Sequence, residues 1–160
     1  HRVDRRQRQM CIRDRSSTCN LSTVKDGRGG IFTWVLDEPI HEFNMLHFYP
    51  GKSRGNHFHP EFVEYFLIVE GSIMMITKDS ETGSEVSMLC SKGTCFRTPK
   101  GVPHATHAIT SATCISLLTK PWDACDEPIV HEDLIPQGDE YLEYARKQGF
   151  EHSAEEIKKK

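Results

Sequence analysis

From Ile31 to Trp122 the sequence is a succession of short apolar or alternating runs that end at turn-forming residues, and this pattern constrains the fold more than any other feature. It is typical of the many short strands of an all-β sandwich or barrel. Because one run ends at Glu70 and Gly71 and the next begins directly at Ser72, we expect a tight hairpin at Glu70 and Gly71. The runs rich in β-branched and aromatic residues cover 31–36, 42–49, 62–71, 72–78, 86–90, 94–99 and 114–122.

The only helical pattern lies near the C-terminus. Over Gly138–Phe150, Tyr141, Leu142 and Ala145 share one side, acidic residues come early and basic residues late, as in a surface helix with favourable ends. A chain of 160 residues is long enough for one domain with a sizeable core. We therefore expect a barrel over residues 21–136, followed by a short C-terminal helix and a charged tail over 137–160.

Residues 1–20 are expected to lie outside the fold. The stretch Arg5–Arg15 resembles the in-frame translation of a transposase-type sequencing adaptor, which predicts an artefact of library preparation. The alternative is a basic arm that binds nucleic acid. Without residues 1–15 the chain has 14 basic and 21 acidic residues, a net charge of −7 that argues against a nucleic-acid partner. No apolar run is long enough to cross a membrane, so we expect a cytoplasmic protein without a membrane partner.

Two histidines and a glutamate stand just before and at the start of an apolar run. Side chains alternate along a strand, so His57 and His59 should face the same side, with Glu64 following at the start of the next strand. These groups are costly to bury, and a bound cation would compensate that cost. His104, after a Pro-x-Gly turn, is a fourth candidate ligand. A lone His-x-His pair is more often solvated, so the argument depends on all four residues.

These residues resemble the two motifs of the cupin superfamily. The first motif, G-x5-H-x-H-x4-E-x6-G, is matched by Gly51, His57, His59, Glu64 and Gly71. The second, G-x5-P-x-G-x2-H-x3-N, is matched by Gly93, Pro99, Gly101 and His104 and differs only at Ala108. The resemblance covers residues 30 to 122 and implies a double-stranded β-helix, the cupin jelly-roll barrel. It also implies one divalent metal ion (Zn, Fe, Mn, Ni or Co) on the three histidines and Glu64.

Two other stretches resemble cupins that modify nucleotide-linked sugars in surface-polysaccharide synthesis, and more distantly the deoxysugar 3,5-epimerases. Asp26, Arg28 and Gly29 match a D-x-R-G-x-F stretch, with Gly30 as an extra glycine, and Arg54, Gly55 and His57 match an R-G-x-H turn. The resemblance implies epimerisation or isomerisation of a nucleotide-linked keto-sugar through metal-assisted enolisation. The histidine of the R-G-x-H turn, His57 in this sequence, is a proton-transfer base in metal-free epimerases and a ligand in metal-holding relatives. The complete ligand set favours the role of ligand here.

Under this hypothesis the remaining polar residues near the motif have roles in substrate binding and proton transfer. Arg54 and Lys52 would bind the diphosphate, and Tyr49, His47 or Tyr65 would supply general acid/base help. The alternative for Arg54 and Lys52 is a solvated, charged turn.

Other functions remain open at the level of sequence. An iron-dependent dioxygenase needs the open coordination positions that this ligand set leaves. A lyase acting on dimethylsulfoniopropionate ranks lower, because Phe66 stands where those enzymes favour a tyrosine and a phenyl ring cannot transfer a proton. A non-catalytic sensor would simply bind a small ligand.

As dimers are common among relatives, we expect a homodimer. His107 is expected to support the site or lie at the surface, and His41 and His131 at the surface.

Overall fold

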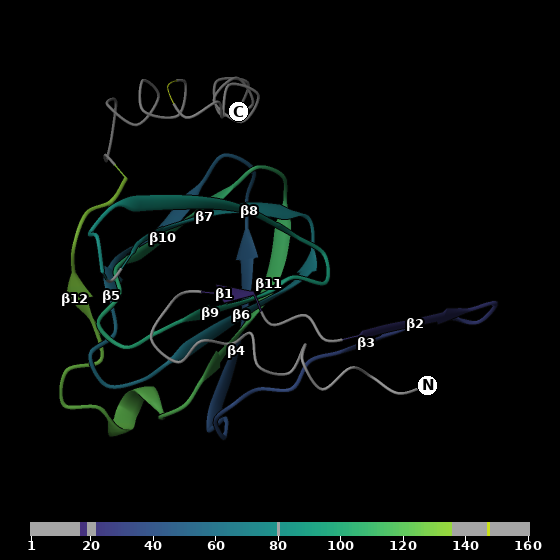
Figure 1. Cartoon of the computed structure of the whole chain (residues 1–160), viewed down its shortest axis with the longest axis horizontal. Coiled ribbons are helices and arrows are strands. Elements are labelled where there is room, and N and C mark those ends of the chain that lie inside the picture. The colour runs from purple at the N-terminus through teal and green to yellow at the C-terminus, as the bar shows by residue number, and fades with distance from the viewer. Residues whose placement is uncertain (1–16, 19–21, 80, 136–146, 148–160) are drawn as a thin grey trace.

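The computed structural model describes residues 17–18, 22–79, 81–135 and 147, which form two five-stranded antiparallel sheets and a separate hairpin (Figure 1). The strands are β1 (Ser17–Thr18), β2 (Ser22–Asp26), β3 (Gly29–Thr33), β4 (Glu42–Phe48), β5 (Ser53–Phe58), β6 (Glu64–Glu70), β7 (Ser72–Lys78), β8 (Glu85–Ser91), β9 (Cys95–Thr98), β10 (His104–Ala108), β11 (Ala112–Leu118) and β12 (Val130–His131), and a 3-10 turn, η2, covers Trp122–Ala124. The all-β prediction is confirmed. The helix predicted over Gly138–Phe150 lies outside the described residues, Lys147 apart.

The two sheets face each other as the halves of a barrel. One has the strand order β1-β9-β6-β11-β4 and the other β12-β5-β10-β7-β8. Alternate side chains of the facing strands fill the space between them, as a pleated strand with one apolar face requires. This core consists of Phe48, Phe66, Ile68, Ile73, Met75, Cys90, Phe96, Ala108, Ala112 and Cys114.

The hairpin predicted at Glu70 and Gly71 is wrong. β6 pairs with β9 and β11, whereas β7 pairs with β8 and β10, so Gly71 is a corner that carries the chain from one sheet to the other. Gly71 has φ +81, and a Cβ at this position would stand 2.1 Å from the carbonyl oxygen of Ser111. Only glycine accepts both the backbone conformation and this close approach.

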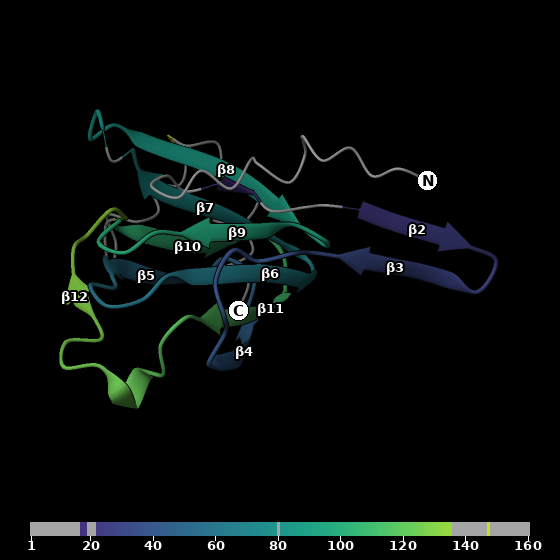
Figure 2. The same ribbon diagram turned by 60° about the horizontal axis from the view of Figure 1, so that its bottom comes forward.

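The run predicted as a strand over 31–36 divides into two parts. Its first residues belong to β3, which pairs with β2 in a hairpin that projects away from the barrel in both views (Figures 1 and 2). Trp34 and Leu36, with Ile40, instead pack on the outer side of β6 against Tyr65. The inner side of β6 faces the core, so this strand is buried on both faces. Among the described residues no helix is long and apolar enough to span a membrane.

Candidate functional site

A cavity of about 460 Å³ opens between the two sheets at one end of the barrel. Its wall combines apolar side chains with a small set of polar ones, which is the usual composition of a small-molecule site. The lining residues are Asn44, Leu46, Phe48, Ser53, Arg54, Gly55, His57, His59, Phe62, Glu64, Phe66, His104, Thr106, Ser116, Leu118 and Trp122.

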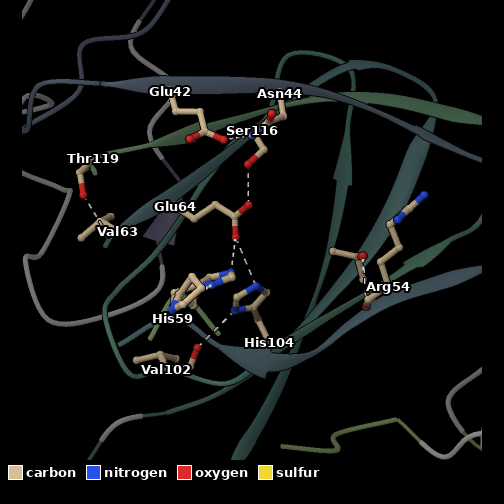
Figure 3. Close-up of polar contacts among 12 residues, drawn as sticks. Glu42, Asn44, Arg54, His59, Val63, Glu64, Val102, His104, Ser116 and Thr119 are labelled. Atoms are coloured by element: carbon tan, nitrogen blue, oxygen red, sulfur yellow. Dashed lines mark hydrogen bonds and ion pairs between the residues drawn. The ribbon is translucent and has the colours of Figure 1, made fainter. Parts of the chain in front are cut away.

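The four predicted metal ligands meet in this cavity. One ring nitrogen from each of His57, His59 and His104 lies within 4.8 Å of the others. Oε2 of Glu64 lies 3.0 Å from Nε2 of His59 and 3.4 Å from Nε2 of His104 (Figure 3). β5 and the residue that follows it carry His57 and His59, and β6 and β10 carry Glu64 and His104. The predicted convergence therefore agrees with the geometry.

Backbone carbonyls orient two of the histidine rings. Nδ1 of His59 lies 2.8 Å from the carbonyl oxygen of Pro128, and Nδ1 of His104 lies 3.3 Å from that of Val102. A carbonyl oxygen only accepts hydrogen bonds, so each Nδ1 must carry the proton. Each Nε2 atom therefore faces Glu64, where it can bind a metal ion when it carries no proton or donate a hydrogen bond to Oε2 when it does.

Glu64 is a buried carboxylate that is satisfied at one oxygen only. Its Oε1 accepts a hydrogen bond of 2.5 Å from the hydroxyl of Ser116 on β11 (Figure 3). Its Oε2 and Nε2 of His104 are both buried without a hydrogen-bond partner. Burial would raise the pKa of Glu64, but contacts with His104 and His59 outweigh it and hold that pKa below its usual value. An ionised carboxylate that faces two ring nitrogens is stabilised by a positive charge beside it, either a proton on one of the rings or a bound metal ion.

A divalent cation would supply such a positive charge, so the donor set fits a metal ion. Burial, with smaller effects of His104 and His59, lowers the pKa of His57 to about 4. The imidazole of His57 is therefore neutral near pH 7, and only a neutral imidazole can donate a lone pair to a metal. Three imidazoles and one carboxylate suit several first-row divalent metals.

Arg54 shares the cavity with the histidines, as the predicted R-G-x-H turn required. Its guanidinium lies over the ring of Phe48, 5.7 Å from the ring centre, and the side chain is exposed on the solvent side. Regular alternation would place Arg54 and His57 on opposite faces of β5. The register shifts between these two positions, where His104 pairs with His57 but Ala105 pairs with Gly55. This β-bulge returns Arg54 to the inner face.

The residues predicted to transfer protons are not brought to the cavity. His47 and Tyr49 follow the outward alternation of β4, where both are exposed and their rings contact each other edge to face. Tyr65 lies on the outer side of β6, fully buried among Trp34 and its neighbours. The prediction assumed the wrong face of each strand, since Leu46 and Phe48 of β4 and Glu64 of β6 are the residues that point inward.

The other charged residues and histidines lie away from the cavity lining. Lys52 is exposed in the turn before β5, and His41 and His131 are exposed as predicted. His107 was expected to support the site or lie at the surface, and the second alternative is wrong because the residue is fully buried. It lies on the face of β10 opposite to His104, with Nδ1 3.0 Å from the hydroxyl of Ser53.

Several cavity residues were missed by the sequence analysis. Ser116 stands at an inward position between Cys114 and Leu118, and a polar residue at a core position of a strand was an available signal. Trp122 in η2 approaches the rings of His59 and Phe62, with ring centres 6.0 and 6.2 Å away. No local pattern indicated that this turn would reach the cavity mouth.

The fold and the histidine cluster together define a cupin barrel. Over residues 24–127 the chain matches the family described as the polysaccharide biosynthesis C-terminal domain, and it belongs to that family. A search of curated proteins found no match.

Solved structures with this fold include sugar-modifying enzymes. A 3,4-ketoisomerase from Helicobacter canadensis aligns with a TM-score of 0.63 and 16% identity, over 82% of this chain and 97% of its own. A dTDP-4-dehydrorhamnose 3,5-epimerase from Sulfolobus tokodaii aligns with a TM-score of 0.65 and 17% identity, over 79% and 87%. The capsular polysaccharide assembling protein CapF from Staphylococcus aureus aligns with a TM-score of 0.54 and 19% identity, over 71% of this chain but 32% of its own. At these identities the likeness establishes the fold.

Proposed function

We propose that this protein is an enzyme that epimerises or isomerises a nucleotide-linked keto-sugar with the help of one divalent metal ion. The observation that carries the proposal is the convergence of His57, His59, Glu64 and His104 in a cavity that also contains Arg54. The family, and the activities of the structural neighbours on nucleotide-linked or related sugars, support the same substrate class.

Different residues of the chain would serve the two parts of the cavity, the diphosphate site at Arg54 and the metal site at the histidines. Arg54 carries a permanent positive charge beside Phe48, where its guanidinium can bind a diphosphate through paired hydrogen bonds. Ser116 holds Glu64, and the Pro128 carbonyl holds His59, so the ligand set is oriented in advance. A divalent ion bound there would supply Lewis acidity beside the sugar carbonyl, which gains negative charge when the neighbouring carbon loses its proton.

Proton transfer has to come from a titratable residue that lines the cavity. Of the three histidines, His57 is the only one that is not fully buried, and its ring is neutral near pH 7, although a pKa of about 4 makes it a weak base. The exposure of His57 supports a second candidate mechanism, in which His57 is the base and no metal is needed. The two mechanisms differ in whether metal removal abolishes proton exchange at the substrate carbon.

The test is exchange of ring protons in deuterated water. Purified protein is analysed for metal content, then incubated with a panel of nucleotide-linked 4-keto-sugars before and after chelation. Deuterium uptake that chelation abolishes and added metal restores supports the first mechanism, whereas uptake that survives chelation supports the second. His41→Ala, which changes an exposed histidine outside the cavity, is the matched control for His57→Ala. No uptake with any sugar would contradict the proposed function.

Oxygen chemistry and simple binding are separated by two further measurements. Oxygen consumption with ferrous iron and substrate would identify a dioxygenase. Thermal stabilisation by a nucleotide sugar without any turnover would identify a binding protein.

We also propose that the protein acts as a homodimer formed through the β2–β3 hairpin. This hairpin is exposed on both faces, including Val24 and Ile31, and an isolated two-stranded hairpin is marginally stable in water. β4, the open edge of its sheet, exposes Phe43 and Met45 at 73% and 75%. In a twofold-symmetric dimer, the hairpin of each copy would cover the exposed β4 edge of the other copy. Ile31→Asp should shift the mass in light scattering from dimer to monomer; a monomeric wild type would contradict the proposal.

A further inference from the structure

The bulge in β5 is built from two consecutive residues with left-handed backbone conformations. Gly55 has φ +96, and a Cβ there would stand 2.7 Å from the carbonyl oxygen of His104. Asn56 has φ 58 and is the only non-glycine residue with positive φ in the part of the chain that the structure describes. Asn56 takes no position in the register between β5 and β10. The backbone at these two residues therefore sets which side Arg54 faces relative to His57.

The side chain of Asn56 fastens this bulge to the segment 128–135. Its amide oxygen accepts hydrogen bonds from the backbone N–H groups of Leu134 and Ile135, at 3.0 and 2.9 Å. Its amide nitrogen donates to the carbonyl oxygen of Ile135 at 2.9 Å. The backbone carbonyl of Asn56 accepts from Glu132. The residue is only 7% exposed, so these bonds are protected from water.

The same segment also reaches the histidines. β12 pairs with β5 so that His131 lies opposite His57 and Val130 opposite Phe58. The carbonyl oxygen of Pro128 accepts the hydrogen bond from Nδ1 of His59. One stretch of chain thus contacts three consecutive sites along β5: the bulge, the strand at His57, and the ring of His59.

We propose that Asn56 is a positioning residue, which holds Arg54 and His57 on the same inner face and keeps segment 128–135 against β5. Removing its side chain leaves the Leu134 and Ile135 N–H groups without their acceptor and removes the preference of asparagine for the left-handed conformation. The two parts of the cavity, anion binding at Arg54 and metal binding at the histidines, should then weaken together. The inference rests on the proposed metal and diphosphate sites.

The experiment compares full-length wild type with Asn56→Ala, Asn56→Asp and Thr110→Val. Asn56→Asp keeps the two acceptor contacts but places an oxygen where the amide nitrogen donates to the Ile135 carbonyl, so it isolates the acceptor contacts. Thr110→Val removes a hydroxyl that accepts a hydrogen bond from the Ser72 N–H in a turn outside the cavity lining, so it controls for a general loss of stability. Three properties are measured: Co²⁺ affinity with its visible absorption spectrum, affinity for thymidine diphosphate, and the melting temperature.

We expect Asn56→Ala to weaken Co²⁺ binding by about 10–100-fold, the usual effect of losing a group that orients metal ligands, with an altered absorption spectrum. Thymidine diphosphate affinity should fall in parallel, and Asn56→Asp, which keeps the two acceptor contacts, should recover part of both. Thr110→Val should change the melting temperature alone. Unchanged affinities and spectrum in a folded Asn56→Ala would overturn the proposal.

Failure of the proposed function gives a different result. If wild type binds neither Co²⁺ nor thymidine diphosphate, the proposed function fails, and crystal structures of the wild type and Asn56→Asp or Asn56→Ala decide the role of Asn56. Arg54 turned to the outer face of β5 in the variant supports the positioning role. Arg54 and His57 still together on the inner face would refute it.

Discussion

Removal of the Ser116 hydroxyl is the sharpest test of how the cavity keeps a buried carboxylate in place. Ser116 is 3% exposed, and its hydroxyl donates the 2.5 Å hydrogen bond to Oε1 of Glu64. Hydrogen bonds to charged groups contribute about 1.5–3 kcal/mol. In a domain of this size each kcal/mol lowers the melting temperature by about 2–4 °C. Ser116→Ala in the metal-free protein should therefore melt about 3–12 °C lower than wild type.

Metal binding by the same variant should fall as well, by about 10–100-fold, because Glu64 loses the group that orients it. Calorimetric melts without metal, followed by Zn²⁺ titration, measure both effects. The control is Thr113→Val, which removes a hydroxyl from the same strand on the outer face, where it lies 3.5 Å from Nδ1 of His47. A Ser116→Ala protein with the melting temperature and Zn²⁺ affinity of the control would refute the reasoning.

Three further predictions concern the remaining residues of the site and its surroundings. His104→Ala should abolish copurification of a metal, as measured by elemental analysis, while His41→Ala retains it; equal metal contents would exclude His104 as a ligand. Arg54→Ala should weaken thymidine diphosphate binding in calorimetry by at least about tenfold, the effect of about 1.4 kcal/mol, whereas Lys52→Ala, outside the cavity lining, should bind as wild type does. Burial lowers the pKa of His107 from 6.5 to about 4, so the unfolded chain takes up the proton first and the free energy of unfolding should fall from pH 6.5 toward pH 4. His107→Gln should show a shallower fall in urea melts over this interval, and an identical slope would contradict the buried neutral state.

Much of the site was predictable because it depends on local spacing. The one-residue separation of His57 and His59 places both on the same side of an extended strand, whatever surrounds them. The matching of two motifs then linked them to Glu64 and His104. The all-β class was equally accessible, because short alternating runs have no other way to bury an apolar face.

What the sequence by itself could not decide was which face of a strand becomes the inside. His47, Tyr49 and Tyr65 follow regular alternation, but the inward phase depends on which sheet covers each strand. The corner at Gly71 shows the same limit, since a glycine at positive φ serves a hairpin or a change of sheet equally well.

Tertiary structure also decided the contacts made by segments far apart in the chain. Asn56 forms hydrogen bonds with Leu134 and Ile135, which follow it by 78 and 79 positions in the chain. The carbonyl oxygen of Pro128 orients the ring of His59, which precedes it by 69 positions. Spacing along the chain was enough to name the four side chains that meet in the cavity as candidate metal ligands. Long-range packing decided their orientation, the inward position of Arg54 and the place of Trp122 in the cavity wall. The physical reason is that strand periodicity relates residues a few positions apart, whereas these contacts join segments far apart in the chain.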